Sequence, residues 1–550
     1  MAAVLAILAS LGQAGAFSPD AGLVNPRGWP QLARFLGAAL RPELDPAFLA
    51  LTLHAAGQTL AFAVLGTLLS LILGSLFGLL SSEAWWRAVL PLRRQSRAFL
   101  GQAWWWPWTA VRSALALPRA IHEVIWGLLL INVLGLDPLT AVLAIGIPYG
   151  AIVAKVYAEI LDETPRAALR ALTAAGSPPP AAVAYALLPQ ALPDLVGYAF
   201  YRFECAIRAA AVLGMVGAGG LGYQLLLSTR SLKFGEMWTL IYALALLGGL
   251  ADLWSGRVRR RLAPGRATRI DDGCGCFVDG RGQLQAVAPR RDRFVTGSIA
   301  FAAALLPVSW WLVGLAPGRL LEPKALARLS ALAAESWPPR LPPGGLAELA
   351  RLSAQTLSMS VLAMALAASL GLLLAFPAAA GWTGRRRRIG DPIAWGLTRA
   401  LLLLIRAVPP PIWALVAIWV FFPGTLPGAL ALAAYTTGIL GRLMAEVLEN
   451  ADLRPARALA ALGARGPALV AYAVLPPTLP RYASYVLYRW EVCIRTTVVV
   501  GLVGAGGLGQ IMRQQIAGFD YHALGSTLAC FVVLTALVDA LSAGLRRTLR

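Results

Sequence analysis

The sequence carries little charge for its length. Only 14% of its 550 residues are Asp, Glu, Lys or Arg, whereas 58% are hydrophobic. An average soluble domain has about 25% charged residues, so this composition excludes an ordinary water-soluble protein and indicates a membrane protein. Acidic residues are the scarcer charge, because 27 Asp and Glu stand against 48 Lys and Arg and leave a net charge of +21.

The residues that enzymes and metal sites use are also scarce. The three histidines are isolated, and no Ser-His-Asp or HExxH arrangement is present. A phosphate-binding G-x-x-x-x-G-K-[ST] loop is missing as well. We therefore expect no metal site, no cofactor bound by this chain and no enzymatic activity of its own. The histidines are His54, His122 and His522.

The five cysteines provide no framework for disulfides or zinc. Cys274 and Cys276 lie close together, but the second pair or the histidines of a zinc site are absent. A redox motif would place two residues between them, where this sequence has one. We interpret this segment as part of a linker. The other cysteines are Cys205, Cys493 and Cys530.

The positive charge favours membrane topology over nucleic-acid binding as its explanation. Arginines cluster in short runs between long apolar stretches, as in the cytoplasmic loops of membrane proteins. If each half of the chain crosses the membrane six times, all these runs fall on one side, which is then the cytoplasm and holds both termini. The runs lie at residues 93–97, 257–261, 385–388 and 546–547.

The chain repeats itself in the same direction. Residues 201–222 align without gaps on residues 488–509, with 14 of 22 positions identical and an offset of 287 residues. Upstream, the pair Gln58-Thr59 matches Gln355-Thr356 at an offset of 297, so the first copy carries ten extra residues near the Trp-rich stretch. The repeat predicts a first module at 1–256, a cytoplasmic linker at 257–294 and a second module at 295–550.

Each copy contains about six apolar stretches of roughly 20 residues, the length that crosses a bilayer. They predict an all-α integral membrane protein with about twelve transmembrane helices. The first stretch is short, and no positive residue precedes it, so a weak span is favoured over a cleaved signal peptide. The predicted spans are residues 2–17, 58–80, 119–136, 139–161, 194–216, 236–255, 296–315, 355–376, 404–422, 427–448, 481–503 and 525–544. Between the first two spans of the second copy, an external loop at 317–350 is expected to hold one short helix, Lys324–Glu335.

A cytoplasmic hairpin is predicted between the fourth and fifth spans of each copy. Residues 163–193 and 450–480 contain helix formers, a glycine and further helix formers that meet a Leu-Pro pair. This pattern predicts a short helix, a turn at Gly176 or Gly463, and a second short helix that ends near Pro189 or Pro476. An ordinary amphipathic interfacial hairpin is the simpler alternative.

The two hairpins resemble the EAA loop of ABC-importer permeases, which docks onto the ATPase. The positions that fit its spacing are Ala171, Gly176, Leu188 and Pro189 in the first copy, and Ala458, Gly463, Leu475 and Pro476 in the second. The glutamate of the family motif is replaced by Arg170 and by Arg457. The resemblance therefore implies an ATPase interface whose charge pairing is reversed.

The segments 201–222 and 488–509 resemble the permease subunit of phosphonate importers, which also serve phosphate esters, phosphite or phosphate. The resemblance implies two type I permease modules in a bacterial inner membrane, surrounded by lipid. It also implies a cytoplasmic ATPase dimer that binds ATP and Mg, and an extracytoplasmic phosphonate-type binding protein. Family members usually pair as homodimers, so one fused chain per complex is expected. A permease of the same architecture for an amino acid or betaine is the alternative.

The glycine-rich ends of these segments also satisfy the G-x-G-x-x-G pattern of dinucleotide-binding folds. That pattern requires a preceding strand and a soluble βαβ unit, whereas an apolar helix is predicted here. We expect the glycines to break the fifth span and to allow close packing, with backbone N–H groups available to an anion. Gly217, Gly219, Gly504 and Gly506 are therefore candidates for the translocation path.

Charged residues inside the fifth spans are the remaining candidates. Glu204 and Arg208, like Glu491 and Arg495, lie four residues apart on a predicted helix, so each pair is expected to meet on one face. A structural ion pair and a role in attracting an anionic substrate are both consistent with this spacing. Tyr201 and Tyr488 are weaker candidates for the same path.

Overall fold

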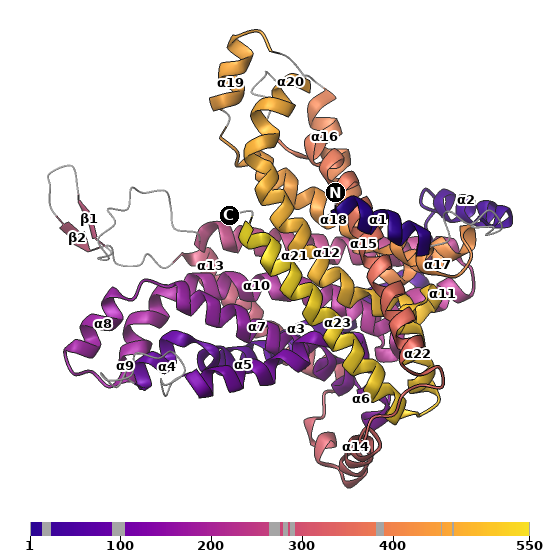
Figure 1. Cartoon of the computed structure of the whole chain (residues 1–550), viewed down its shortest axis with the longest axis horizontal. Helices are drawn as coiled ribbons and strands as arrows, with labels where there is room; N and C mark the ends of the chain where they lie inside the picture. Colours follow the sequence, from indigo (N-terminus) through magenta and orange to yellow (C-terminus); the bar gives the residue numbers. More distant parts are fainter. Residues whose placement is uncertain are drawn as a thin grey trace. The chain divides into compact units, whose positions relative to one another are not determined.

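The computed structural model describes residues 2–13, 24–90, 105–262, 276–278, 284–286, 292–380, 390–452, 454–464 and 467–548. In this part of the chain nearly every element is a helix (Figure 1). The exceptions are two three-residue strands, β1 (Cys276–Val278) and β2 (Leu284–Ala286), which pair antiparallel. The all-α class is confirmed. Most of the predicted linker, Cys274 included, lies outside the described residues.

The chain forms two compact units, and each combines segments that are distant in sequence. Unit 1 contains Met1–Thr52, Gln224–Ala245 and Glu322–Arg550, and unit 2 contains Leu53–Tyr223 and Leu246–Leu321. These units follow packing, whereas the predicted modules at 1–256 and 295–550 follow the sequence repeat. The module boundaries therefore stay a prediction.

Eleven of the predicted spans correspond to helices of suitable length and apolarity, if each bent pair of helices counts as one span. Seven are single helices: α3 (Pro46–Ser81), α7 (Pro138–Glu163), α12 (Phe234–Leu262), α13 (Arg293–Val313), α15 (Gly345–Ala378), α18 (Thr425–Glu449) and α23 (Tyr521–Thr548). The predicted external helix is also present, as α14 (Pro323–Glu335).

The predicted first span is not among these helices. Helix α1 (Ala2–Gln13) has 12 residues, about 18 Å of helix, which is short of the roughly 30 Å hydrocarbon core. Residues 14–17 lie outside the described part. An even number of crossings is needed to place both termini on one side of the membrane, so their shared cytoplasmic location stays a prediction.

The third span of each copy is broken, not straight as predicted. In unit 2, α5 (Trp105–Ala120) and α6 (Glu123–Leu134) meet at 83°, and in unit 1, α16 (Gly390–Ala407) and α17 (Pro410–Val420) meet at 92°. The second break has a covalent cause, because prolines 409–411 have no backbone N–H to continue the helix. At the first break, His122 caps α6 by accepting from the Val124 N–H.

Small residues let the long helices of each unit approach closely. On α3, Gly66, Gly74 and Gly78 face α7, and a Cβ added to Gly74 would lie only 2.3 Å from Val153 Cγ1. Unit 1 uses Ala363, Ala367, Gly371 and Ala375 of α15 against α18 in the same way. Small residues spaced by four are how helices pack within a membrane, where hydrophobicity supplies no force between them.

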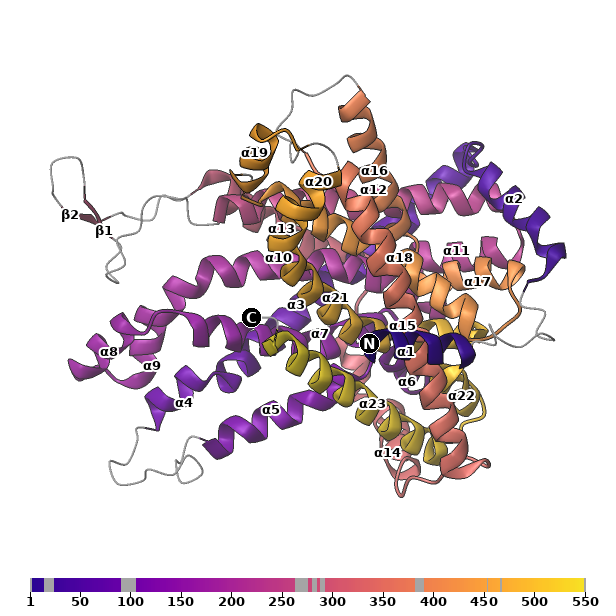
Figure 2. The same cartoon turned by 45° about the horizontal axis from the view of Figure 1, so that its top comes forward.

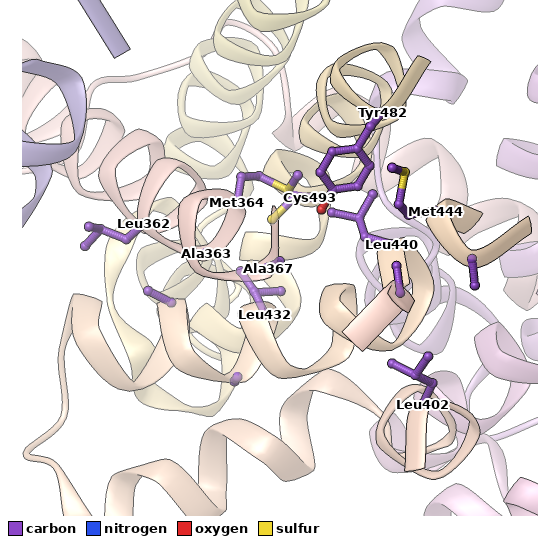
Figure 3. Packing of buried hydrophobic residues seen from close by; sticks show 14 of the residues in the cluster. Leu362, Ala363, Met364, Ala367, Leu402, Leu432, Leu440, Met444, Tyr482 and Cys493 are labelled. Carbon is purple, nitrogen blue, oxygen red and sulfur yellow. The ribbon is translucent and has the colours of Figure 1, made fainter. Parts of the chain in front are cut away.

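The resulting core of unit 1 joins α15, α16, α18 and α21 (Leu475–Val500) (Figure 3). Leu440 and Met444 of α18 are fully buried in it, and the Tyr482 hydroxyl of α21 donates to the Ala368 carbonyl of α15. This packing fixes the helix on which the candidate residues of the second copy lie.

The N-terminal segment packs within unit 1. Helix α1 lies along α15, where the Ser358 hydroxyl donates to Gln13 at 2.7 Å. Further on, the Asn25 N–H donates to the Val420 carbonyl of α17. Phe35 of α2 (Trp29–Ala38) meets the Trp419 ring edge to face and lies tilted against the Trp238 ring. The first 52 residues therefore stabilise the unit that holds the second copy.

Candidate functional site

The first half of each predicted hairpin forms as expected. Helix α8 (Ala167–Ala174) ends at Gly176 with φ +84°, and α19 (Arg454–Ala461) ends at Gly463 with φ +91°. The Ser177 N–H reaches back to the Leu172 carbonyl, and the Ala464 N–H to the Leu459 carbonyl, both at 3.1 Å. This is the Schellman cap, in which glycine adopts the left-handed conformation without steric cost.

The second half of each hairpin differs from the prediction, because no helix ends at Pro189 or Pro476. After α9 (Pro179–Ala182) the chain continues through a π-helical turn, η3 (Val183–Leu187), directly into α10 (Leu188–Leu213). The second copy follows the same course through α20 (Pro467–Leu469) and η6 (Val470–Val474) into α21. In the π turn the Leu188 N–H bonds five residues back to Val183, and this wider winding brings the chain to the proline without a break.

Most of the predicted coupling residues are exposed on the surface of the hairpins. Leu169 is buried on the inner face of α8, whereas Arg170 on the outer face is exposed (Figures 1 and 2 show α8 and α9 beside α4, Glu83–Val89). The exposed members of the predicted set are Arg170, Ala171, Gly176, Leu188 and Pro189, and then Arg457, Ala458, Gly463 and Pro476; Leu475 is half-buried. The sequence reasoning missed Tyr185 and Tyr472, which are 80% and 78% exposed, although the 287-residue offset relates them.

An ion pair fastens the helix that leads into each hairpin. Asp162, near the end of α7, accepts from Arg112 of α5 and from the Ser82 hydroxyl, at 3.3 and 2.7 Å. The Arg112 Nε also donates to the Ser81 carbonyl, which ends α3. One arginine therefore ties together the ends of α3, α5 and α7.

The second copy repeats this clamp with the residues at equivalent positions. Arg399 of α16 pairs with Glu449 at the end of α18 at 2.8 Å, and its Nε donates to Ala378 at the end of α15. Glu449 also accepts from the Ala380 N–H. The sequence signal was available, since Arg112/Arg399 and Asp162/Glu449 share the 287-residue offset.

The glycine motifs break the fifth spans, as predicted. The π turns η4 (Gly214–Ala218) and η7 (Gly501–Ala505) are followed by α11 (Gly220–Arg230) at 57° and α22 (Gly507–Ala517) at 66°. Three glycines of each motif have positive φ: Gly217, Gly219 and Gly220, and Gly504, Gly506 and Gly507. A helix precedes each motif, so the dinucleotide-fold interpretation fails on its first requirement.

The expectation that these motifs offer backbone N–H groups to an anion is wrong for three of those groups. The Gly220 N–H donates to Gln58 Oε1 at 3.1 Å, and the Leu221 N–H donates to Thr59 Oγ1 at 2.9 Å. In the second copy, the Leu508 N–H donates to Thr356 Oγ1 at 2.9 Å. Gln58 and Thr59 in the first copy, and Thr356 in the second, therefore cap the helix that starts after the glycines.

The charged residues of the fifth span pair as predicted in the first copy. The Glu204 carboxylate is buried, and Arg208 Nη2 lies 3.3 Å from it. Tyr201, one turn earlier, lies against Arg259 of α12, whose guanidinium carbon is 5.7 Å from the ring centroid. This cluster connects α10 to the end of α12.

In the second copy the predicted pairing of the Glu491 and Arg495 side chains is wrong. Glu491 instead pairs with Arg546 of α23. Arg495 Nη2 lies 3.7 Å from Asp539 of α23, while its Nε donates only to the backbone carbonyl of Glu491. Residues four apart lie on one face of a helix, but here α23 provides the partners instead. Its Asp539 pairs with Arg495, and its Arg546 pairs with Glu491. Tyr488 is half-exposed.

The structure adds a charged residue that the sequence analysis passed over. Arg202 of α10 is only 7% exposed, and its guanidinium carbon lies 3.7 Å from the centroid of the Tyr149 ring of α7. Its pattern Tyr-Arg-aromatic-Glu recurs at 488–491, which was the available signal. Among the described residues no group of three or more His, Cys, Asp or Glu side chains is placed to hold a metal ion.

Comparison with known proteins finds the same architecture twice in this chain. Residues 98–266 and 371–550 both match the family described as binding-protein-dependent transport system inner membrane component. The phosphate-import permease protein PhnE of Mycolicibacterium smegmatis is 27% identical over 95% of this chain and 90% of its own length. The phosphite transport system permease protein PtxC of Stutzerimonas stutzeri is 33% identical over 46% of this chain and 88% of its own length.

A solved structure is also similar. It is titled as an inward-facing conformation of the MetNI methionine ABC transporter, and it is 22% identical. The alignment covers 40% of this chain and 100% of that one, with a TM-score of 0.34.

Proposed function

Because the chain belongs to the family of inner-membrane components of binding-protein-dependent transport systems, we propose that it is the permease of an ATP-driven importer for phosphorus oxyanions. It is a multi-pass membrane protein and a transport subunit, not an enzyme. The observation that carries the proposal is the similarity to a phosphate-import permease over 95% of the chain. The similarity of one half to a phosphite permease points to the same substrate class.

The proposed partners are a cytoplasmic ATPase dimer, which binds ATP and Mg, and a phosphonate-type binding protein on the other face. Two hairpins with the same Schellman cap support this, because a two-fold ATPase dimer needs two docking elements. One chain then supplies both docking elements. Arg170 and Arg457 are exposed on these hairpins, so we propose that they meet acidic residues of the ATPase.

Uptake by the reconstituted complex tests this function. The permease, with an ATPase and binding protein from the same organism, is placed in proteoliposomes loaded with ATP and offered phosphate, phosphite or methylphosphonate. Betaine and methionine serve as comparison substrates. ATP-dependent uptake of at least one phosphorus oxyanion, and of neither comparison substrate, is expected. Uptake of betaine or methionine alone would overturn the proposal.

A charge reversal tests the docking separately. The double variant Arg170→Glu, Arg457→Glu should recover much less ATPase in a pull-down than the wild type. Restored recovery with a charge-reversed ATPase would identify the contact. Unchanged recovery would show that these arginines do not meet the partner.

A further inference from the structure

Arg202 differs from Arg208 and Arg495 of the fifth spans because, among the described residues, it has no acidic partner. Arg208 pairs with Glu204, Arg495 with Asp539, and Arg546 with Glu491. In the described part of the chain, Arg202 donates no hydrogen bond from Nε or Nη2, and no carboxylate lies within ion-pair distance of it. Its contact is the face of the Tyr149 ring.

Leaving a buried guanidinium without an anion is costly. Arg202 lies eight residues, about 12 Å, inside the stretch 194–216 of α10 that is predicted to span the membrane. Charged groups at this depth are rare, and they mark a substrate or ion path when no structural partner neutralises them. The cation–π contact with Tyr149 recovers part of the lost hydration, but less than a carboxylate would supply.

The two nitrogens without partners form one edge of the guanidinium. Nε–H and Nη2–H point in parallel, and this edge matches two oxygens of a phosphate or phosphonate group in a bidentate contact. This donor set suits a tetrahedral oxyanion.

We propose that Arg202 contacts the phosphorus oxyanion as it passes through the first copy. The proposal rests on the proposed function and deepens it. It also replaces Arg208 and Arg495 as the substrate-attracting arginines, since carboxylates already neutralise these two. Both nitrogens are shielded from solvent in this conformation, so the contact belongs to another state of the transport cycle.

The equivalent position of the second copy is built differently. Arg489 is partly buried and its Nε also lacks a partner, but Thr436 stands where the first copy has Tyr149. The aromatic face that holds the guanidinium is therefore a feature of the first copy. For this reason the contact is assigned to Arg202.

Uptake by the full complex tests this assignment, with phosphate, phosphite and methylphosphonate as probes. Three variants are compared with the wild type: Arg202→Met, Arg202→Lys and, as a matched loss of one exposed positive charge, Arg230→Met. The maximal uptake rate is measured at saturating loaded binding protein. The thermal unfolding temperature of each purified permease is measured in parallel.

Arg202→Met is expected to lower the maximal uptake rate by about tenfold or more, the scale of a lost charge-assisted contact. Arg202→Lys keeps the charge but loses the bidentate edge, so it should retain several times the rate of Arg202→Met. Arg230→Met should transport like the wild type. The unfolding temperatures of the Arg202 variants should stay close to that of the wild type, because replacing Arg202 leaves no buried carboxylate without its partner.

Two results would overturn the proposal. One is wild-type uptake by Arg202→Met. The other is an equal loss of uptake in Arg202→Met and Arg202→Lys that follows a fall in unfolding temperature, which would show a structural role. If the wild-type complex takes up none of the three anions, the proposed function fails, and this inference fails with it.

Discussion

Arg112 and Asp162 join the helix that precedes the first hairpin to two other helices. Their side chains meet at 3.3 Å, Arg112 also binds the last carbonyl of α3, and α8 starts five residues after Asp162. Arg399 and Glu449 repeat the arrangement in the second copy. A displacement of either hairpin therefore moves the ends of three helices together.

Removing both clamps should uncouple ATP hydrolysis from transport. In Arg112→Met, Arg399→Met the hairpins stay folded, but their motion is no longer passed to α3 and α15. The number of substrate molecules transported per ATP hydrolysed should fall roughly two- to thirtyfold. This corresponds to a loss of about 0.5–2 kcal/mol in coupling free energy. Because the arginine side chains are 39% and 35% exposed, the ion pairs add little stability, about 1 kcal/mol or less each. Uptake and hydrolysis measured on the same proteoliposomes check this.

Arg87→Met is the control for the clamps. Arg87 pairs with Glu83 of the same helix, α4, so its loss removes an ion pair that lies within one helix. Transport per ATP should match the wild type in this variant. An unchanged ratio in the double clamp variant would refute the coupling role.

Thr59 and Thr356 should stabilise the protein through the hydrogen bonds that their hydroxyl oxygens accept, and not through the volume of their side chains. Thr59→Val and Thr356→Val keep the volume but leave the buried N–H of Leu221 or Leu508 without an acceptor, which costs about 1–3 kcal/mol. Thr59→Ser and Thr356→Ser keep the hydroxyl and should lose much less. Thermal unfolding in detergent separates the two, and equal losses for valine and serine would contradict the cap.

Gly222 should tolerate no side chain. A Cβ there would lie 1.8 Å from the Ala211 carbonyl oxygen, which is part of the backbone and cannot rotate away. Gly222→Ala should therefore destabilise the protein by about 3 kcal/mol. Gly248→Ala on α12 meets nothing within 4 Å and should be neutral or slightly stabilising. Unfolding temperatures check both, and a neutral Gly222→Ala would refute the close approach.

Double-mutant cycles should reveal the different ion pairs of the two copies. Glutamine substitutions at Glu204 and Arg208 should show a coupling energy of about 0.5 kcal/mol or more, since these side chains touch. The same cycle at Glu491 and Arg495 should be close to additive, whereas Glu491 and Arg546 should couple. The coupling energies are calculated from free energies of unfolding. Equal coupling in the first two cycles would show that Glu491 and Arg495 pair in the same way as Glu204 and Arg208.

Features set by neighbouring residues could be read from the sequence. The spans depend on long apolar runs, and the turns at Gly176 and Gly463 depend on glycine's access to positive φ. Prolines 409–411 also indicate the break before α17, because proline cannot continue a helix. The break was not predicted, since the apolar run around these prolines favoured one continuous span. The course of the chain through Pro189 was not readable, since a π turn depends on how the hairpin packs.

The sequence by itself determined the membrane class, the duplication, eleven of the spans and the first helix and turn of each hairpin, because each follows from local composition or from comparing the chain with itself. Only the tertiary structure decided which charges meet. Arg495 and Asp539 are 44 residues apart, and Arg202 and Tyr149 are 53 apart, so their contacts depend on how separate helices pack. The same packing leaves Arg202 without a carboxylate, which no spacing along the chain could show.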